Sequence, residues 1–195
     1  DAMRKGCEIK TGLISTATFE EKFQEALDAD QDVLYFSLSK NISGNFNSAR
    51  LAAEELLNQN TTGRKIRLID SLNASLAQGI LAIYASLMRD KGMSVDEVAD
   101  FLEPLVGKMN GVFTVGDLKY LSHTGRIKGS VATIGNVLKI KPILRGNKDG
   151  YIVTYKNVRG RKSALNTLIN LVCDNIVKPE EQIIGIAHAD AYEDS

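Results

Sequence analysis

The stretch FSLSKNISGNFNSARLAAEELL, residues 36–57, joins an apolar strand to an amphipathic helix through a polar turn that contains glycine. The run DVLYFSLS (32–39), which overlaps its start, is apolar and rich in aromatic and β-branched residues, as buried parallel strands are. From Asn45 onward, apolar residues recur at helical spacing. This order of strand, turn and helix begins a βαβ unit and predicts a mostly parallel sheet.

The alternation of strand and helix patterns continues on both sides of this stretch. Further strands of the same apolar character are predicted at 65–71, 111–115 and 182–189. Helices are predicted at 18–29, 45–59, 72–92, 94–109 and 161–177. The sequence SVDE gives the helix at 94–109 a capping box, with Ser94 as the N-cap and Glu97 three residues later.

The pattern changes near residue 108. In residues 140–160, Asn-Lys-Asp-Gly stands between two β-rich runs and predicts a hairpin. We therefore expect an α/β protein, in which a parallel doubly wound sheet domain at 1–108 precedes a second, α+β domain at 109–195. The chain opens on DAMRKGCEIKTG, which resembles the tail of a helix, and stops on HADAYEDS, where a strand would lead into a helix. We expect a chain without the usual N- and C-terminal flanks of its fold.

Composition excludes several classes of protein. The 195 residues carry 24 basic and 24 acidic side chains, so nothing resembles a nucleic-acid-binding or anionic-membrane surface. The longest helix-like apolar segment, 72–88, is too short and too polar to span a bilayer, so we expect no stable membrane insertion. Cys7 and Cys173 are isolated thiols, which fits a reducing cytoplasm. The cysteines and the two histidines show no metal-ligand spacing, and no metal site is predicted.

The polar turn after the first strand is a candidate anion site. Ligands of open α/β sheets bind beyond the carboxyl ends of the strands, where this turn lies. Gly44 allows close approach of the backbone, Ser43 and Asn45 add side-chain donors, and the following helix presents free N–H groups. The Gly-Lys-Ser/Thr step of a P-loop is missing, which disfavours a nucleoside triphosphate. The alternative is that Ser43 or Asn45 only caps the helix.

Two further clusters of hydroxyl groups precede predicted helices. Thr11, in KTGLIST (10–16), could lean over the same strand ends, although an ordinary loop threonine is the alternative. In IDSLNASLAQG (69–79), Ser71 and Ser75 follow the second strand, and the alternative role of Ser71 is that of an N-cap. Ser39, which ends the first strand, is a further hydroxyl at this edge.

The segment KYLSHTGRIKGS (119–130) gathers His123, Arg126 and Lys128 around a glycine turn. A guanidinium in such a turn suits bidentate contact with a carboxylate or a phosphate, and the alternative is a solvated basic turn. No Ser–His–Asp spacing is present, so a nucleophilic triad is not indicated. A second basic stretch, NVRGRK (157–162), is interpreted as surface.

Together these stretches resemble the DegV family, the bacterial fatty-acid-binding proteins that include the acyl-binding subunit of fatty acid kinase. The resemblance is carried, in order, by KTGLIS, SLSKNISGNFNSAR, IDSLNASLAQG, LKYLSHTGRIKGSVATIGNVLKIKPIL and DGYIVTYKNVRGRKSAL. It spans nearly the whole chain. It implies a two-domain protein in which a long-chain fatty acid lies in a tunnel between or within the domains.

The resemblance also implies roles for single residues. Thr11 and Ser43 would be the hydroxyls that bind the acyl carboxylate, within a site that includes Gly44 and Asn45, and Arg126 would lie near the head group and the kinase docking face. Ser39, Ser71 and Ser75 would be accessory.

This sequence departs from the family pattern at two of these positions and at its ends. Gly12 and Asn45 stand where the family has serine and threonine. A histidine that usually completes the site would lie in the missing C-terminal segment, and His188 matches a different position of the family.

The implied function is carriage of a long-chain fatty acid, whose carboxylate is presented to a separate fatty acid kinase catalytic subunit and phosphorylated for phospholipid synthesis. The resemblance implies no cofactor, and no residue is arranged as a nucleophile or base, so we expect a non-enzyme in the bacterial cytoplasm. The apolar faces of 76–88 and 131–144 are candidates for the tunnel wall. Two alternatives remain open: a phosphotransferase or hydrolase that binds phosphate at the glycine turn and Arg126, and a pure interaction module.

Overall fold

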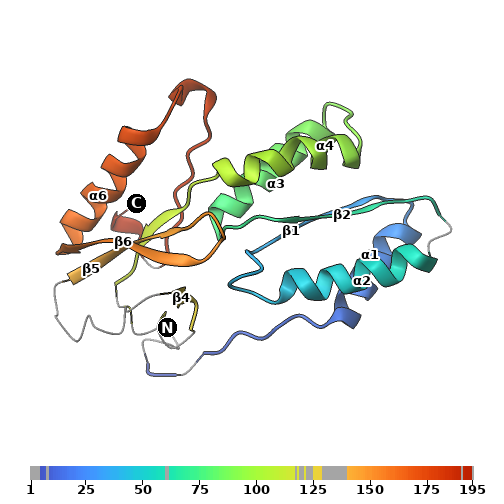
Figure 1. Cartoon of the computed structure of the whole chain (residues 1–195), viewed down its shortest axis with the longest axis horizontal. Helices are drawn as coiled ribbons and strands as arrows, with labels where there is room; N and C mark the ends of the chain where they lie inside the picture. Colours follow the sequence, from blue (N-terminus) through green and yellow to red (C-terminus); the bar gives the residue numbers. More distant parts are fainter. Residues whose placement is uncertain are drawn as a thin grey trace.

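The computed structural model describes residues 5–7, 9–59, 62–116, 118, 121, 125–128, 140–189 and 191–194. It confirms the predicted mixed α/β fold, with one parallel sheet and one mainly antiparallel sheet. Figure 1 shows the parallel pair between two layers of helices, with the second sheet beyond one end of it. The predicted division of the chain at residue 108 stays a prediction.

The first sheet consists of β1 (Val33–Ser37) and β2 (Ile66–Asp70), which pair in parallel from Val33↔Ile66 to Ser37↔Asp70. The helix α2 (Asn45–Gln59) makes the crossover between them, as predicted. The helix α1 (Thr16–Asp28) precedes β1 and packs against α2. Ser15 begins α1, because its Oγ accepts a hydrogen bond from the Thr18 backbone N–H.

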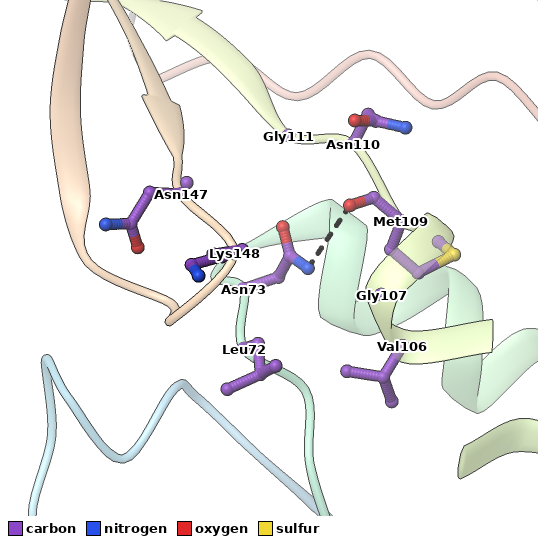
Figure 2. A pocket seen from close by; sticks show the side chains of 10 residues that line it. Leu72, Asn73, Val106, Gly107, Met109, Asn110, Gly111, Asn147 and Lys148 are labelled. Atoms are coloured by element: carbon purple, nitrogen blue, oxygen red, sulfur yellow. Dashed lines mark hydrogen bonds between the residues drawn. The ribbon is translucent and has the colours of Figure 1, made fainter. Parts of the chain in front are cut away.

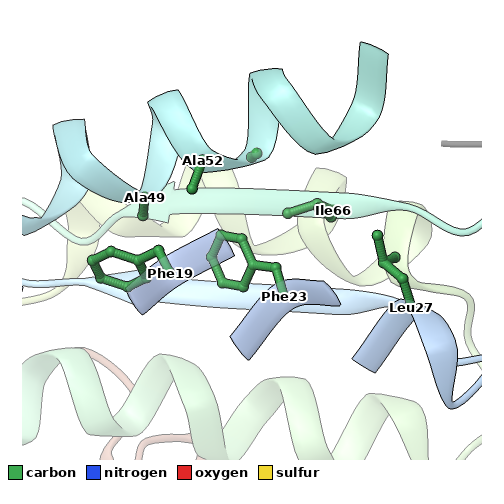
Figure 3. Close-up of a cluster of buried hydrophobic side chains, with 7 residues drawn as sticks. Phe19, Phe23, Leu27, Ala49, Ala52 and Ile66 are labelled. Atoms are coloured by element: carbon green, nitrogen blue, oxygen red, sulfur yellow. The ribbon is translucent and has the colours of Figure 1, made fainter. Parts of the chain in front are cut away.

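Both faces of this sheet are buried, which explains why its strands read as continuous apolar runs. Val33 and Tyr35 face α1 and α2, whereas Leu34 and Phe36, on the opposite face, pack against a second pair of helices. Figure 3 shows the cluster on the first face, which comprises Phe19, Phe23, Leu27, Ala49, Ala52, Ala53 and Ile66. The buried residues that α2 contributes here are alanines, so the aromatic rings of α1 fill the space that these small side chains leave.

The second pair of helices differs from prediction in where its first helix begins and where its second helix ends. The helix α3 (Leu76–Arg89) begins four residues later than expected, because Ser71–Asn73 forms a turn in which Leu72 has φ +49°. The helix α4 (Val95–Leu102) has the predicted capping box. It ends early and continues as the 3₁₀ helix η1 (Glu103–Lys108), which has a proline in its first turn.

The second sheet has the strand order β3-β5-β6-β4. Its members are β3 (Val112–Thr114), β4 (Ile127–Lys128), β5 (Ile140–Gly146) and β6 (Ile152–Arg159). The predicted hairpin is confirmed as β5 and β6, and α6 (Arg161–Asn175) packs against the sheet. The strand predicted at 111–115 exists as β3, but the parallel pairing expected of it is wrong: β3 pairs antiparallel with β5.

The prediction of a buried strand at 182–189 is wrong. This segment follows the 3₁₀ helix η3 (Pro179–Glu181), precedes η4 (Tyr192–Asp194) and pairs with no strand in the described part of the chain. Ile184 and Ile186 are 59% and 72% exposed. Gly185 contacts the Leu76 side chain closely, so the segment lies against α3 instead of a sheet edge.

Among the described residues, no helix is long and apolar enough to cross a membrane.

An ion-pair network holds β2 to α4, and it predicts how stability depends on pH. Arg67 donates to Asp100 and Glu103, each at 2.8 Å, and to Asp96 at 3.0 Å. The Lys65 ammonium, and then the Arg67 guanidinium, hold the pKa of Asp96 below its usual value of 3.8. A carboxyl group with a lowered folded-state pKa stabilises the fold above its usual pKa, and this contribution is lost as the pH falls through the folded value.

We therefore expect Arg67→Gln to flatten the acid limb of the stability curve below about pH 5. The measurement is the free energy of unfolding in urea at a series of pH values. Arg89→Gln is the control, because within the described part of the chain Arg89 forms an ion pair only with its neighbour Asp90. Equal slopes for wild type and Arg67→Gln would contradict this account of the network.

Candidate functional site

Four chain segments meet beyond the carboxyl end of β1. They are the turn at 39–45, the extended segment at 11–14, the residues around Arg126, and the hairpin turn at 147–150 between β5 and β6. Their sequence separations are large, so the fold alone brings them together. The candidate site is the turn at 39–45 with the residues that surround it.

The turn at 39–45 is organised by Ser39. Its carbonyl oxygen accepts hydrogen bonds from the backbone N–H groups of Ile42 and Ser43, both at 3.0 Å. Its own N–H donates to the Asn73 carbonyl at 2.9 Å, which ties this turn to the one after β2. The Ser39 side chain is fully buried, and its Oγ accepts from the Asn41 N–H at 3.3 Å. Ser39 is therefore a structural centre of the turn.

Ser43 lies where α2 begins. Its Oγ accepts a hydrogen bond from the Asn45 N–H at 3.3 Å, so it performs part of the capping role that was the alternative to ligand binding. A hydroxyl that accepts through a lone pair keeps its own proton, which can still be donated to an anion. The next N–H groups of the helix, at Phe46 and Asn47, have no acceptor within the helix, and the positive end of the helix dipole lies here. Capping and anion binding are thus compatible at Ser43, which is half-buried.

The segment at 11–14 crosses the start of α2. The Ile14 N–H donates to Asn45 Oδ1 at 3.1 Å, and a Cβ atom at Gly44 would lie 3.0 Å from Leu13 Cδ1. Gly44 therefore lets the Leu13 side chain pack closely on the turn, and the exposed Thr11 lies two residues from this contact. The side-chain oxygen of Asn45 holds this segment, and its NH₂ group remains as a possible donor.

Arg126 approaches the same turn from the second sheet. Its Nε donates to the Ile42 carbonyl at 3.4 Å, and its side chain is exposed. Gly125 before it has φ +66°, a left-handed conformation that glycine adopts without strain. Of the predicted cluster, only the Arg126 side chain can be placed, because His123 and the side chain of Lys128 lie outside the described residues.

The turn after β2 is a polar scaffold. Ser71 is fully buried, and its Oγ donates to the Asn73 carbonyl and accepts from the Asn73 N–H, both at 3.2 Å. Asp70 Oδ1 accepts from the Lys40 N–H at 3.2 Å, which again joins the two turns. Ser71 is not the N-cap of α3: that position belongs to Ser75, which is exposed and makes no capping bond through its side chain.

Sequence reasoning assigned no site role to Asn41, Asp70 and Asn73, whose side chains bond to the backbone of the two turns and of the hairpin. The signal that could have revealed them is their position, since each lies at or just after a strand end and has a side chain able to bond to nearby backbone. Asn41 Nδ2 donates to the Asp149 carbonyl at 2.6 Å, and Asn73 Nδ2 donates to the Ser71 carbonyl at 3.0 Å.

A small pocket lies behind the turn that follows β2, beside the hairpin turn (Figure 2). Its volume is about 50 Å³, which suits a few water molecules, whereas ligand pockets span roughly 300–1,000 Å³. Its lining residues include Leu72, Asn73, Met109, Gly146 and Lys148. This pocket is not the predicted acyl tunnel.

The proposed tunnel walls are only partly described. Residues 131–139 lie outside the described part of the chain, and Ile143 and Leu144 of β5 are fully buried. Within 76–88, Leu81 and Met88 pack into the core between the first sheet and α3–α4. These two side chains therefore belong to the core.

Comparisons with known proteins agree on one family. A family model described as "Uncharacterised protein, DegV family" matches residues 1–195. The chain is 36% identical, over 193 residues, to a DegV domain-containing protein of Clostridium perfringens, covering 99% of this chain and 66% of that protein. The crystal structure of a DegV lipid-binding protein from Thermotoga maritima has a TM-score of 0.76 and 29% identity, covering 89% of this chain and 58% of that one.

A second solved structure concerns fatty acid binding of a DegV family protein from Thermus thermophilus. It has a TM-score of 0.75 and 30% identity, covering 88% of this chain and 59% of that one. The chain thus spans between 58% and 66% of the lengths of these three proteins.

The contact between Asn45 and the segment at 11–14 can be tested without any ligand. We expect Asn45→Ala to speed amide hydrogen exchange at Ile14 by about threefold to tenfold, since a hydrogen bond contributes roughly 0.5–1.5 kcal/mol. Asn47→Ala is the control, because Asn47 lies exposed on the same helix and its side chain accepts only from Arg50 among the described contacts. Unchanged exchange at Ile14 in the Asn45→Ala variant would show that this bond does not hold the segment.

Proposed function

Because the chain belongs to the DegV family, we propose that it binds a long-chain fatty acid and presents the carboxylate to a separate kinase subunit. The proposal is supported by the lipid-binding and fatty-acid-binding proteins of similar fold from Thermotoga maritima and Thermus thermophilus. The proposed carboxylate site comprises Thr11, Ser43, Gly44, Asn45 and Arg126.

The observation that carries the proposal is the geometry at the start of α2. An ionised carboxylate leaves water only at a cost of several kcal/mol unless donors replace the lost water. The Ser43 hydroxyl, the Asn45 amide group and the free N–H groups of the first helical turn are such donors. The Arg126 guanidinium, held beside Ile42, adds a positive charge at the rim.

The acyl chain supplies the larger part of the binding energy in this proposal. At about 0.8 kcal/mol per buried methylene, fourteen methylenes contribute roughly 11 kcal/mol before the costs of ordering and association. We propose that the tail lies in a tunnel between or within the domains 1–108 and 109–195. The buried residues Ile143 and Leu144 are candidates for its wall.

We further propose that the protein carries the fatty acid without reacting with it. The kinase subunit would phosphorylate the presented carboxylate, and the acyl phosphate would enter phospholipid synthesis in the cytoplasm. Apart from Lys40, whose ammonium lies 3.7 Å from an Asp70 carboxylate oxygen, the polar side chains of the 39–45 turn are hydroxyls and amides. Their contacts cap and position backbone, an arrangement suited to binding.

The central test is removal of the Ser43 hydroxyl. We expect Ser43→Ala to weaken binding of a long-chain fatty acid by about ten- to a hundredfold, since hydrogen bonds to charged groups contribute roughly 1.5–3 kcal/mol. The measurement is titration of the delipidated protein with oleate by calorimetry. Ser163→Ala, an exposed serine on α6, is the matched control and should bind as wild type does. Unchanged affinity in Ser43→Ala would remove Ser43 from the site.

The proposal that a separate kinase subunit catalyses the phosphorylation predicts a second result. The purified protein, loaded with oleate and mixed with ATP and Mg²⁺, should form no acyl phosphate until a fatty acid kinase catalytic subunit is added. The product is measured by trapping with hydroxylamine and mass spectrometry. Turnover of ATP by the protein alone would favour a phosphotransferase instead.

A further inference from the structure

We propose that the hairpin turn at residues 147–150, here termed the latch, positions the carboxylate-binding turn at 39–45. This inference rests on the proposed function, because it assigns a positioning role toward the same site. The latch belongs to the second sheet, and the turn that it contacts belongs to the first. Binding of the carboxylate would thereby depend on how the second sheet sits against the first.

The latch touches the turn at two points. Gly150 is buried against Ser39, where a Cβ atom would lie 2.2 Å from Ser39 Oγ and 3.1 Å from Leu72 Cα. Next to it, the Asp149 carbonyl accepts a hydrogen bond of 2.6 Å from Asn41 Nδ2. No side chain at position 150 fits beside Ser39, so the Gly150 backbone lies directly against the Ser39 side chain and the Leu72 backbone.

The latch is itself a rigid turn. The Asn147 carbonyl accepts from the Gly150 N–H at 2.9 Å, and the Asn147 N–H donates to the Tyr151 carbonyl at 2.9 Å. Asn147 Oδ1 accepts from the N–H groups of Asp149 and Tyr151 at 3.0 and 2.9 Å. A turn with this many internal bonds moves with β5 and β6 as one body, so it can transmit the position of the hairpin to Ser39.

The contact reaches the ligand-binding residues through one hydrogen bond. The Ser39 carbonyl accepts from the Ser43 N–H at 3.0 Å, and Ser43 bears the hydroxyl that we assign to the carboxylate. From the other side, the Asn73 carbonyl holds the Ser39 N–H. Ser39 is therefore fixed between the latch and the turn after β2, and a displacement of Ser39 moves Ser43. Gly150 and Asn41 are positioning residues that act through Ser39.

The chain offers a matched pair of glycines for the test. Gly150 and Gly92 have similar left-handed conformations, with φ +79° and +83°, but a Cβ atom at Gly92 would meet nothing within 4 Å. Alanine strains the backbone comparably at both positions, so both variants should lose stability. Only Gly150→Ala should also displace Ser39.

We expect Gly150→Ala to weaken oleate binding at least tenfold in calorimetric titration, while Gly92→Ala stays within twofold of wild type. In the ligand-free proteins, amide exchange at Ser43 should accelerate in Gly150→Ala and not in Gly92→Ala. Adding Ser39→Gly to Gly150→Ala relieves the contact with Ser39 and should restore part of the slower Ser43 exchange. A purely structural role for Gly150 would lower stability without this selective change at Ser43.

A variant that perturbs the fold less tests the same contact if Gly150→Ala fails to fold. Asn41→Ala removes only the bond to Asp149 and should weaken oleate binding about threefold, whereas Asn58→Ala, at the exposed end of α2, should not. If Ser43→Ala weakens binding but Gly150→Ala and Asn41→Ala bind as wild type does, the positioning role of the latch is contradicted, whereas the assigned carboxylate site is supported. If Ser43→Ala binds normally while Ser43 exchange still responds to Gly150→Ala, the positioning contact is supported and the assigned carboxylate site fails.

Discussion

One backbone hydrogen bond, from the Ser39 N–H to the Asn73 carbonyl, joins the two turns that follow β1 and β2. It forms beyond the last paired residues of the sheet, Ser37 and Asp70, where the parallel ladder no longer holds the chains together. The bond from the Lys40 N–H to Asp70 Oδ1 runs beside it. The start of α2 is thus held by its neighbour in the sheet, so the donors that we propose for the carboxylate are positioned by the fold itself.

The elements that carry this edge could be predicted because local chemistry determines them. Because β1 and β2 are buried on both faces, their sequences are continuous apolar runs. The helical spacing of apolar residues in α2 begins directly after the glycine turn. The Asn-Lys-Asp-Gly hairpin was predictable for a similar reason, since Gly150 takes the positive φ that the turn requires and Asn147 bonds to the backbone after it. Ser94 and Glu97 form their capping box within a single helical turn.

The features that escaped prediction depend on contacts between distant segments. Apolar pattern indicates burial but not the partner of a strand, so Ile184 and Ile186 suggested a strand where the chain lies exposed beside α3. The turn at 39–45 was recognised as a candidate site, yet the buried position of Ser39 depends on the space left by Gly150, which lies 111 positions later in the sequence. Hydroxyl clusters alone do not reveal which hydroxyls bond within their own turns and which remain able to meet a ligand.

The charges around the turn bear on why a carrier would bind an anion here without a lysine clamp. Lys40 is part of the turn, but its ammonium lies 3.7 Å from Asp70 Oδ2, so a nearly buried carboxylate of the neighbouring strand offsets its charge. The donors at Ser43 and the start of α2 are dipoles, and Arg126 stands exposed at the rim. A buried ion pair is costly to separate, whereas a carboxylate held mainly by dipoles can be given up with less loss. A protein that must hand the head group of its ligand to a partner is better served by the second arrangement, and the half-buried position of Ser43 leaves that head group within a partner's reach.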